Sequence, residues 1–334
     1  MTALLGALAG ALPAADPQLM RLVMPDVKVM SDVNVLQARL SPFGQYVLSQ
    51  VGSGSIQQLT TATGFDPRQD LIELLLVSNG TSGIGTTGIG TTSIGTTGIG
   101  TAGIGTPGVG GASNSLVLAS GVFDPAKIAA AATVGGATQE IYKGVTIIEG
   151  GKQPGGVAFP NGSILIAGSV ANVKAAIDRQ TAPSTLPLGL VTQVNELSVA
   201  YDAWALSTVS PAALAPAAEG KGEAIGGMKI PLSALQQVQA GYLGVKFGAN
   251  VAFAAQAQSD TDENAAGLAG MLQLVGNIAQ MQTAQNPSAA AFAKSLTVTA
   301  KGNLVNISAS MPEAQFQQLF APKAAVKHLQ GERK

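Results

Sequence analysis

Residues 156–167 read GVAFPNGSILIA, and this stretch decides which fold we expect. Two apolar runs flank the pair Asn161-Gly162, which is a strong signal for a tight turn between antiparallel strands. Ser169 then offers a helix cap, and residues 170–179 have the apolar spacing of a helix that packs on one side. The stretch therefore predicts a β-hairpin followed by a helix that covers it.

The same order of elements recurs about 140 residues later. Residues 296–308 read LTVTAKGNLVNIS, in which Lys301-Gly302-Asn303 forms the turn. Ser310 is the expected cap, and residues 312–320 are the expected helix. We therefore predict an α+β protein made of two related halves. Each half contains antiparallel strands or a hairpin packed against helices.

The expected division between the halves lies at the proline-containing segment 183–187. It gives a first half at residues 16–182 and a second half at residues 183–322. An apolar leader precedes the first half at residues 1–15. A basic tail follows the second half at residues 323–334.

Residues 80–111 form a low-complexity insertion in the first half. Residues 83–107 repeat pentapeptides such as GIGTT, and 13 of the 32 residues of the whole segment are glycine. Ordering this much glycine is entropically costly, and one isoleucine per repeat buries little apolar surface in return. Strand-like runs flank the segment at residues 71–77 and 115–119. We therefore expect a long Gly/Thr/Ile-rich loop between two neighbouring strands.

Charge is scarce along the whole chain. Only 11% of the residues are charged and the formal net charge is −1, whereas an average soluble protein is about 25% charged. A nucleic-acid-binding surface needs an excess of lysine and arginine, so no nucleic-acid partner is expected. A disordered acidic chain is excluded as well, because 46% of the residues are hydrophobic.

The first residues resemble a secretory leader. Residues 3–12 are apolar, and small residues follow before Asp16. The stretch is too short to span a bilayer, which takes about 20 residues. It lacks the basic residues that usually begin a leader, so an ordinary apolar helix is the alternative. We predict export to the periplasm or cell envelope and no transmembrane span.

Catalytic signatures are weak. The chain has no cysteine and a single histidine, His328, which excludes cysteine-ligated metals and histidine pairs. Gly83 begins a match to the dinucleotide-binding glycine pattern, but more repeat follows it instead of a helix. No cofactor or metal is therefore expected. The tightest carboxylate group is Asp66, Asp70 and Glu73, which are weak candidates for acid–base catalysis.

The longest expected helix covers residues 262–284. No charged residue occurs between Asn264 and Ala293. Packing on a sheet is the simplest interpretation of its apolar side. A surface that binds an apolar ligand or a protein partner is the alternative, and its candidate residues are Leu268, Met271, Leu272, Val275, Ile278 and Met281.

Several segments resemble an uncharacterised family of exported acidobacterial proteins. The resemblance lies in residues 22–29, 33–35 and 41–48, and again in residues 64–71 and 123–128. It covers most of the chain except residues 80–111. The shared motifs are helix caps, turns and strand starts. The resemblance therefore implies export, and it supplies no activity and no catalytic residue.

These observations favour a non-enzymatic exported protein that binds an apolar ligand or an envelope protein, although they do not exclude an enzyme. A hydrolase or other enzyme that uses the three carboxylates is one alternative. An adhesive surface protein that acts through the repeat at residues 83–107 is the other.

Overall fold

The computed structural model describes residues 15–50, 53–79, 115–150, 155–183, 185–210, 224–225, 228–229, 236–281 and 287–320. The apolar leader up to residue 14, the insertion at residues 80–111 and the tail at residues 323–334 lie outside these ranges. None of the helices in the described segments has the length and apolar character needed to cross a membrane.

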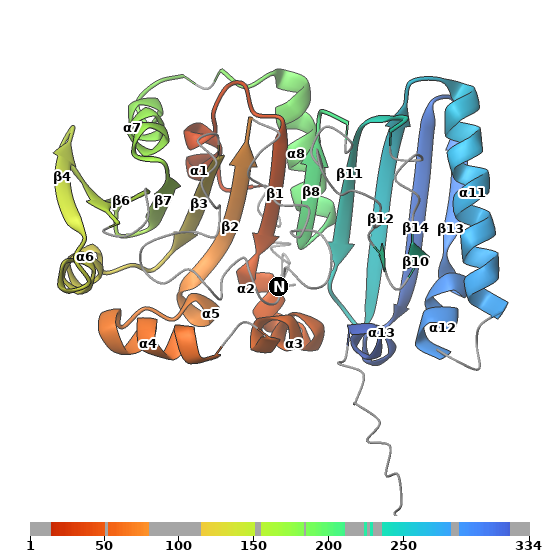
Figure 1. Cartoon of the computed structure of the whole chain (residues 1–334), viewed down its shortest axis with the longest axis horizontal. Coiled ribbons are helices and arrows are strands. Elements are labelled where there is room, and N and C mark those ends of the chain that lie inside the picture. The colour runs from red at the N-terminus through yellow and green to blue at the C-terminus, as the bar shows by residue number, and fades with distance from the viewer. Residues whose placement is uncertain are drawn as a thin grey trace, which may run out of the picture.

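One antiparallel sheet of twelve strands organises the chain, with helices packed on its faces (Figure 1). The strand order is β13-β14-β12-β11-β8-β1-β2-β3-β7-β6-β5-β4. The fold is therefore mixed α+β, as the sequence predicts. The strands are β1 (Val29–Asn34), β2 (Leu71–Ser78), β3 (Ser115–Gly121), β4 (Thr138–Tyr142), β5 (Val145–Glu149), β6 (Gly156–Asn161), β7 (Ile164–Gly168), β8 (Ala203–Ser207), β11 (Val238–Lys246), β12 (Asn250–Ser259), β13 (Thr297–Lys301) and β14 (Leu304–Pro312).

Within the described residues, helices connect many of these strands, and a short ladder of β9 (Ala224–Ile225) and β10 (Met228–Lys229) stands apart from the large sheet. The helices are α1 (Pro17–Leu22), α2 (Val35–Leu40), α3 (Pro42–Gln50), α4 (Ser53–Thr63), α5 (Pro67–Asp70), α6 (Pro125–Val134), α7 (Val170–Arg179), α8 (Leu188–Ala200), α11 (Asp262–Met281), α12 (Pro287–Ser295) and α13 (Glu313–Phe320).

The local predictions around the first hairpin are confirmed. Strands β6 and β7 pair with Asn161 opposite Ile164, and the Asn161 side chain accepts a hydrogen bond from the Ser163 backbone at 2.8 Å. The Ser169 hydroxyl accepts a hydrogen bond from the Asn172 backbone at 3.2 Å. Ser169 is therefore the cap of α7, which closes over the strands before it.

The second hairpin differs in one detail. Strands β13 and β14 pair around Gly302, whose φ of 57° lies in the left-handed region that glycine tolerates. However, β14 continues to Pro312, and Ser310 lies opposite Ala252 of β12. The prediction that Ser310 caps a helix is wrong, because pairing with β12 holds this segment extended.

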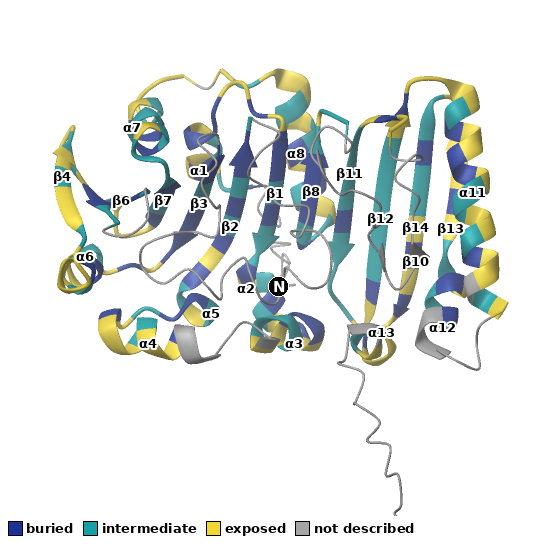
Figure 2. Cartoon of the chain, in the orientation of Figure 1, coloured by how far each residue is buried: buried dark blue, intermediate teal, exposed yellow. Residues whose placement is uncertain are grey.

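The two faces of the sheet have separate cores. We call the side that carries Trp204 the Trp204 face. Residues that lie directly opposite each other share a face, so Leu118, Leu75, Asp32 and Trp204 form one row across β3, β2, β1 and β8. Helices α1, α7 and α8 pack on this row. Figure 2 shows the buried residues concentrated in the strands around β1.

The opposite face carries three smaller apolar clusters. Helix α6 packs over Ala119 and Phe159, and α11 packs over Val298 and Val305. The third cluster joins α3 to α13 through Phe43 and Phe316, whose ring centroids are 4.9 Å apart. The chain thus buries apolar surface on both sides of a single sheet.

The flanks of the insertion are neighbouring strands, as predicted. Strands β2 and β3 pair, with Ser78 opposite Ser115, so a much shorter connection reaches between them. We expect that deleting residues 83–107 changes the melting temperature by no more than ~3 °C, or roughly 1 kcal/mol for a chain of this size. Calorimetry of the full-length and deleted chains checks this. A fall of ~10 °C or more would show that the insertion contributes to the folded core.

Candidate functional site

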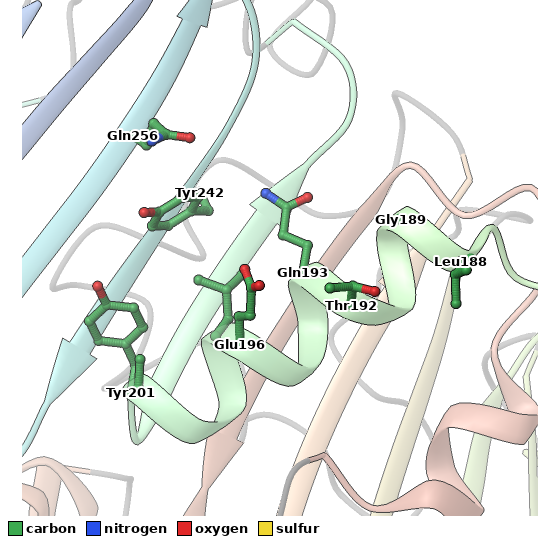
Figure 3. A pocket seen from close by; sticks show the side chains of 10 residues that line it. Leu188, Gly189, Thr192, Gln193, Glu196, Tyr201, Tyr242 and Gln256 are labelled. Carbon is green, nitrogen blue, oxygen red and sulfur yellow. The ribbon is translucent and has the colours of Figure 1, made fainter. Parts of the chain in front are cut away.

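A pocket of about 700 Å³ opens between helix α8 and the strands β11 and β12 (Figure 3). Its lining combines aromatic rings, aliphatic side chains and uncharged polar groups, with one acidic group, Glu196. The lining residues are Leu188, Gly189, Thr192, Gln193, Glu196, Leu197, Ala200, Tyr201, Tyr242 and Gln256.

The register of the sheet explains why the pocket lies here. A second row on the Trp204 face runs through Leu116, Val77, Met30 and Leu206, all of which are buried. The row continues to Tyr242 of β11. Beyond it lie the polar side chains of Gln256 and Asn306, which are joined by a hydrogen bond of 2.8 Å. Tyr242 therefore marks the point where the apolar row ends and a polar surface begins.

Tyr201 enters the pocket because glycine faces it. Tyr201 directly follows α8, and its backbone N–H donates to the Leu197 carbonyl at 2.8 Å. A Cβ atom at Gly244 would lie 2.3 Å from the Tyr201 ring, a distance that no side chain tolerates. Gly244 thus allows the ring to lie close against β11, near Tyr242 and Gln256 (Figure 3).

Hydrogen bonding and apolar contact are the chemistry that this pocket offers. Burial raises the pKa of the Tyr201 phenol, and Tyr242 adds to the effect. The phenol therefore stays neutral at physiological pH and acts as a donor and acceptor. Such amphipathic rings suit a ligand that has an apolar body and a hydrogen-bonding group.

A pair of buried carboxyl groups lies elsewhere on the Trp204 face. Asp32 of β1 and Glu73 of β2 are only 4% and 9% exposed, and both lie on the Trp204 face of neighbouring strands, where the charge of Glu73 acts on Asp32. Burial raises the pKa of Asp32 well above its ordinary value, and the Glu73 charge raises it further. Burial also raises the pKa of Glu73, although the Asp16 backbone N–H opposes this rise. Both carboxyl groups therefore keep their protons to a higher pH than exposed carboxyl groups do.

All three sequence candidates for catalysis accept hydrogen bonds from the surrounding fold. Asp66 caps α5 and accepts hydrogen bonds from the Arg68 backbone at 3.0 Å and the Arg68 Nη2 atom at 2.9 Å. Asp70 accepts from the Asp66 backbone at 2.7 Å. Glu73 lies in β2 beside Asp32. The pocket lining includes none of the four carboxyl groups of Asp32, Asp66, Asp70 and Glu73.

The candidate surface of α11 divides between two environments. Leu268 is buried in the core over β13 and β14, and Met271 and Leu272 pack against the same cluster. Val275 is half-buried, whereas Ile278 and Met281 are 48% and 84% exposed. Leu274 is exposed on the same side of the helix.

The pocket residues carry little signal at the level of sequence. Tyr201 and Tyr242 are 41 positions apart, and their surroundings carry no recognisable motif. Asp32 was detectable in principle, because it occupies an inward position of an apolar strand. In the described segments, no group of three or more histidine or acidic residues is placed to hold a metal ion.

The carboxyl pair generates a prediction about pH. Because the pKa values of Asp32 and Glu73 are raised on folding, the folded chain binds these protons more tightly than the unfolded chain. Their contribution is complete below the unfolded pKa values of about 4 and is lost as the pH rises through the raised values. The free energy of unfolding of the full-length chain is therefore expected to rise as the pH falls from 8 to about 5.

Asp32→Asn isolates this effect, because it removes the charge and keeps the shape. We expect it to increase the free energy of unfolding at pH 8 by about 1–3 kcal/mol and to flatten the pH dependence. Urea unfolding between pH 5 and pH 8 measures both. Asp262→Asn, at an exposed position of α11, is the control. Identical pH slopes for Asp32→Asn and the unmutated chain would contradict the assignment.

Comparison with known proteins informs the fold. No protein-family model matches the chain. No curated protein matches it. Among solved structures, crystal form III of TP0453 is similar with a TM-score of 0.52 at 9% identity, over 90% of this chain and 96% of that one. Crystal forms I and IV have TM-scores of 0.48 at 8% and 10% identity, over 90% and 91% of this chain and 95% and 96% of theirs. The likeness to crystal form III shows a shared mixed α+β fold that extends over most of both chains.

Proposed function

We propose that this chain is an exported, non-enzymatic protein that binds an apolar ligand in the pocket between α8 and β11. The observation that carries the proposal is the pair of half-buried tyrosines, Tyr201 and Tyr242, at the point where the apolar row of the sheet ends. The apolar leader at residues 3–12 supports export.

The lining narrows the class of ligand. Leu188, Leu197 and the two tyrosine rings supply apolar contact, and Gln193 and Gln256 supply hydrogen bonds. Glu196 is the one charged residue in the lining, so it repels an anionic head group. A neutral molecule with an acyl or aromatic body and a hydroxyl or amide group fits these side chains best.

We also infer that residues 16–182 and 183–322 are related halves. From the centre of the sheet outward, one side has the order β1-β2-β3-β7-β6 and the other has β8-β11-β12-β14-β13. In both, three strands of the large sheet are followed by a helix, then by a hairpin that pairs with the third strand, and then by a final helix. The first half adds the hairpin β4-β5, and the second half adds α12 and the β9-β10 ladder. In the first half the final helix, α7, packs on the Trp204 face, whereas in the second half α13 packs on the opposite face.

The placement of α7 and α13 on opposite faces supports the proposed binding site in the second half. Where α7 covers the sheet, the strands present Leu118 and Ile166. At corresponding rows of the second half, the strands present Gln256 and Asn306. The second half thus has a sheet surface suited to polar contact directly beside the apolar end of α8.

Tyr242→Ala tests the pocket. We expect the full-length chain to bind Nile red, a neutral apolar dye, and to release it when a neutral monoacylglycerol is added. The substitution removes a ring from the wall, so we expect affinity for the dye to fall about tenfold, or ~1.4 kcal/mol. Fluorescence titration measures the affinity.

Tyr142→Ala is the matched control, because Tyr142 lies on β4 at the far edge of the sheet. Its affinity for the dye should equal that of the unmutated chain. The matching fatty acid should displace the dye less well than the monoacylglycerol, and Glu196→Gln should remove that difference. Equal dye binding by both tyrosine variants would refute the pocket as the site.

A protein partner on α11 is the second candidate function. Leu274, Ile278 and Met281 are 60%, 48% and 84% exposed and recur every three or four residues along one side of the helix. A convex helix surface cannot enclose a small molecule, but it suits the groove of another protein. The envelope protein expected from the export proposal is the occupant that we assign to it.

A photo-crosslinking residue at position 278 tests this surface in the exporting cell. We expect one dominant cross-linked envelope protein, identified by mass spectrometry. The same residue at position 134 is the control, because Val134 is 92% exposed on α6 at the other end of the sheet. The same cross-linked proteins from both positions, or none from position 278, would exclude α11 as a specific surface.

A further inference from the structure

A backbone nitrogen and two buried carboxyl groups from separate elements lie together on the Trp204 face. Asp16 precedes α1, Asp32 lies in β1 and Glu73 lies in β2. The backbone nitrogen of Asp16 donates to both carboxylate oxygens of Glu73, at 3.1 Å and 3.2 Å. The Asp16 side chain turns away to cap α1, where it accepts from the Gln18 backbone at 2.8 Å.

This cluster is short of positive charge. Within the described residues, no lysine or arginine forms an ion pair with Asp32 or Glu73. Asp32 is 4% exposed, and its Oδ1 atom has no hydrogen-bond partner. Ser120 and Trp204, which share this face, also have a buried polar atom without a partner. Buried carboxylates require a compensating cation or hydrogen-bond donor. This cluster therefore lacks a group that balances its charge.

The nitrogen of Asp16 can supply the positive charge that this cluster lacks. A metal ion is disfavoured, because the described acidic residues form no group of three placed to hold one. The atom that contacts both oxygens of Glu73 is the nitrogen of Asp16, and the residues directly before it are Ala14 and Ala15. Ala14 and Ala15 are small, like the residues at the end of a secretory leader where a leader peptidase cuts, and Pro13 occupies the third position before the cut.

We propose that the leader is removed between Ala15 and Asp16, and that the α-ammonium group so formed binds the buried carboxyl pair of Glu73 and Asp32. This inference rests on the export proposed above. The reaction is hydrolysis by the leader peptidase of the exporting cell. Water adds across the Ala15–Asp16 peptide bond, its hydroxyl completes the Ala15 carboxyl group, and its proton goes to the Asp16 nitrogen. The amine then takes a second proton from solvent.

Processing changes the donor that Glu73 receives. In the unprocessed chain, the Asp16 amide offers one hydrogen and no charge. The processed chain offers three hydrogens and a full positive charge at the same nitrogen, within reach of both oxygens of Glu73, whose charge acts on the neighbouring Asp32. The bond is cut while the chain is unfolded during export, so the burial of Ala15 does not protect it. Processing thus completes the charge balance of the cluster when the chain folds.

The first test identifies the N-terminus. The unmutated chain is produced in an exporting bacterium, and the protein from the periplasmic fraction is measured by intact mass spectrometry. We expect a chain that begins at Asp16. An exported chain that begins elsewhere, for example at Leu12 after the Ala9-Gly10-Ala11 sequence, overturns this inference and leaves the export proposal standing. A chain that keeps Met1 and stays in the cytoplasm overturns both.

The second test asks whether the α-ammonium group is paired. An unpaired α-amine has a pKa near 8 and reacts readily with acylating reagents at pH 7. We expect N-hydroxysuccinimide acetate to label Asp16 of the folded, processed chain at least about tenfold more slowly than in the same chain unfolded in urea. Peptide mass spectrometry measures the rate. Equal rates in the folded and unfolded chains overturn the inference without the use of any variant.

Variants then locate the partner of the amine. Glu73→Gln should restore fast labelling in the folded chain, whereas Glu263→Gln, at an exposed position of α11, should leave it slow. If Glu73→Gln does not fold, Asp32→Asn serves instead and should accelerate labelling by a smaller factor, because Glu73 remains. If the folded Glu73→Gln variant is still labelled slowly, burial alone protects the amine, and the proposed pairing is overturned.

Discussion

Strand β1 is the element on which the rest of the structure depends. It pairs with β2 on one side and β8 on the other, and both pairings use nearly its whole length. All the strands on either side of the sheet are connected through it. A slip of one residue would turn Met30 away from the Trp204 core and expose it on the opposite face. The apolar neighbours of Met30 and the burial of Asp32 therefore fix one register for the entire sheet.

The elements that the sequence predicts correctly are those governed by near neighbours. Ser169 and Asp124 cap helices because each side chain reaches a backbone N–H three residues away. The Asn161 turn forms for a similar local reason. Ser310 is the instructive failure. Its sequence context suits a cap, but a long-range pairing with Ala252 holds it in a strand, and no local pattern reports that pairing.

The candidate site also depends on pairing between distant strands, which no local sequence pattern reports. The pocket exists because β11 lies beside β8, which brings Tyr242 next to Leu206 and lets Tyr201 close over Gly244. The carboxyl pair exists because β1 lies beside β2. Glu73 lies near Asp66 and Asp70 in the sequence, whereas its neighbour in space is Asp32 from another strand. Pairing between distant strands therefore decides which polar groups meet.

The low charge of the chain follows from how its polar groups are used. Gln273 of α11 donates to the Val298 carbonyl at 2.9 Å, and Gln280 donates to the Ala293 carbonyl at 3.0 Å. These amides attach the helix to β13 and α12, a role that a charged side chain fills poorly because burying its charge costs more. Gln273 is exposed and Gln280 is half-buried, so these amides lie at the margin of the packed side, and Leu274 and Ile278 remain on the exposed side. The glutamines of this charge-free helix therefore bond to neighbouring elements. Its outer apolar residues are left available for contact with another molecule.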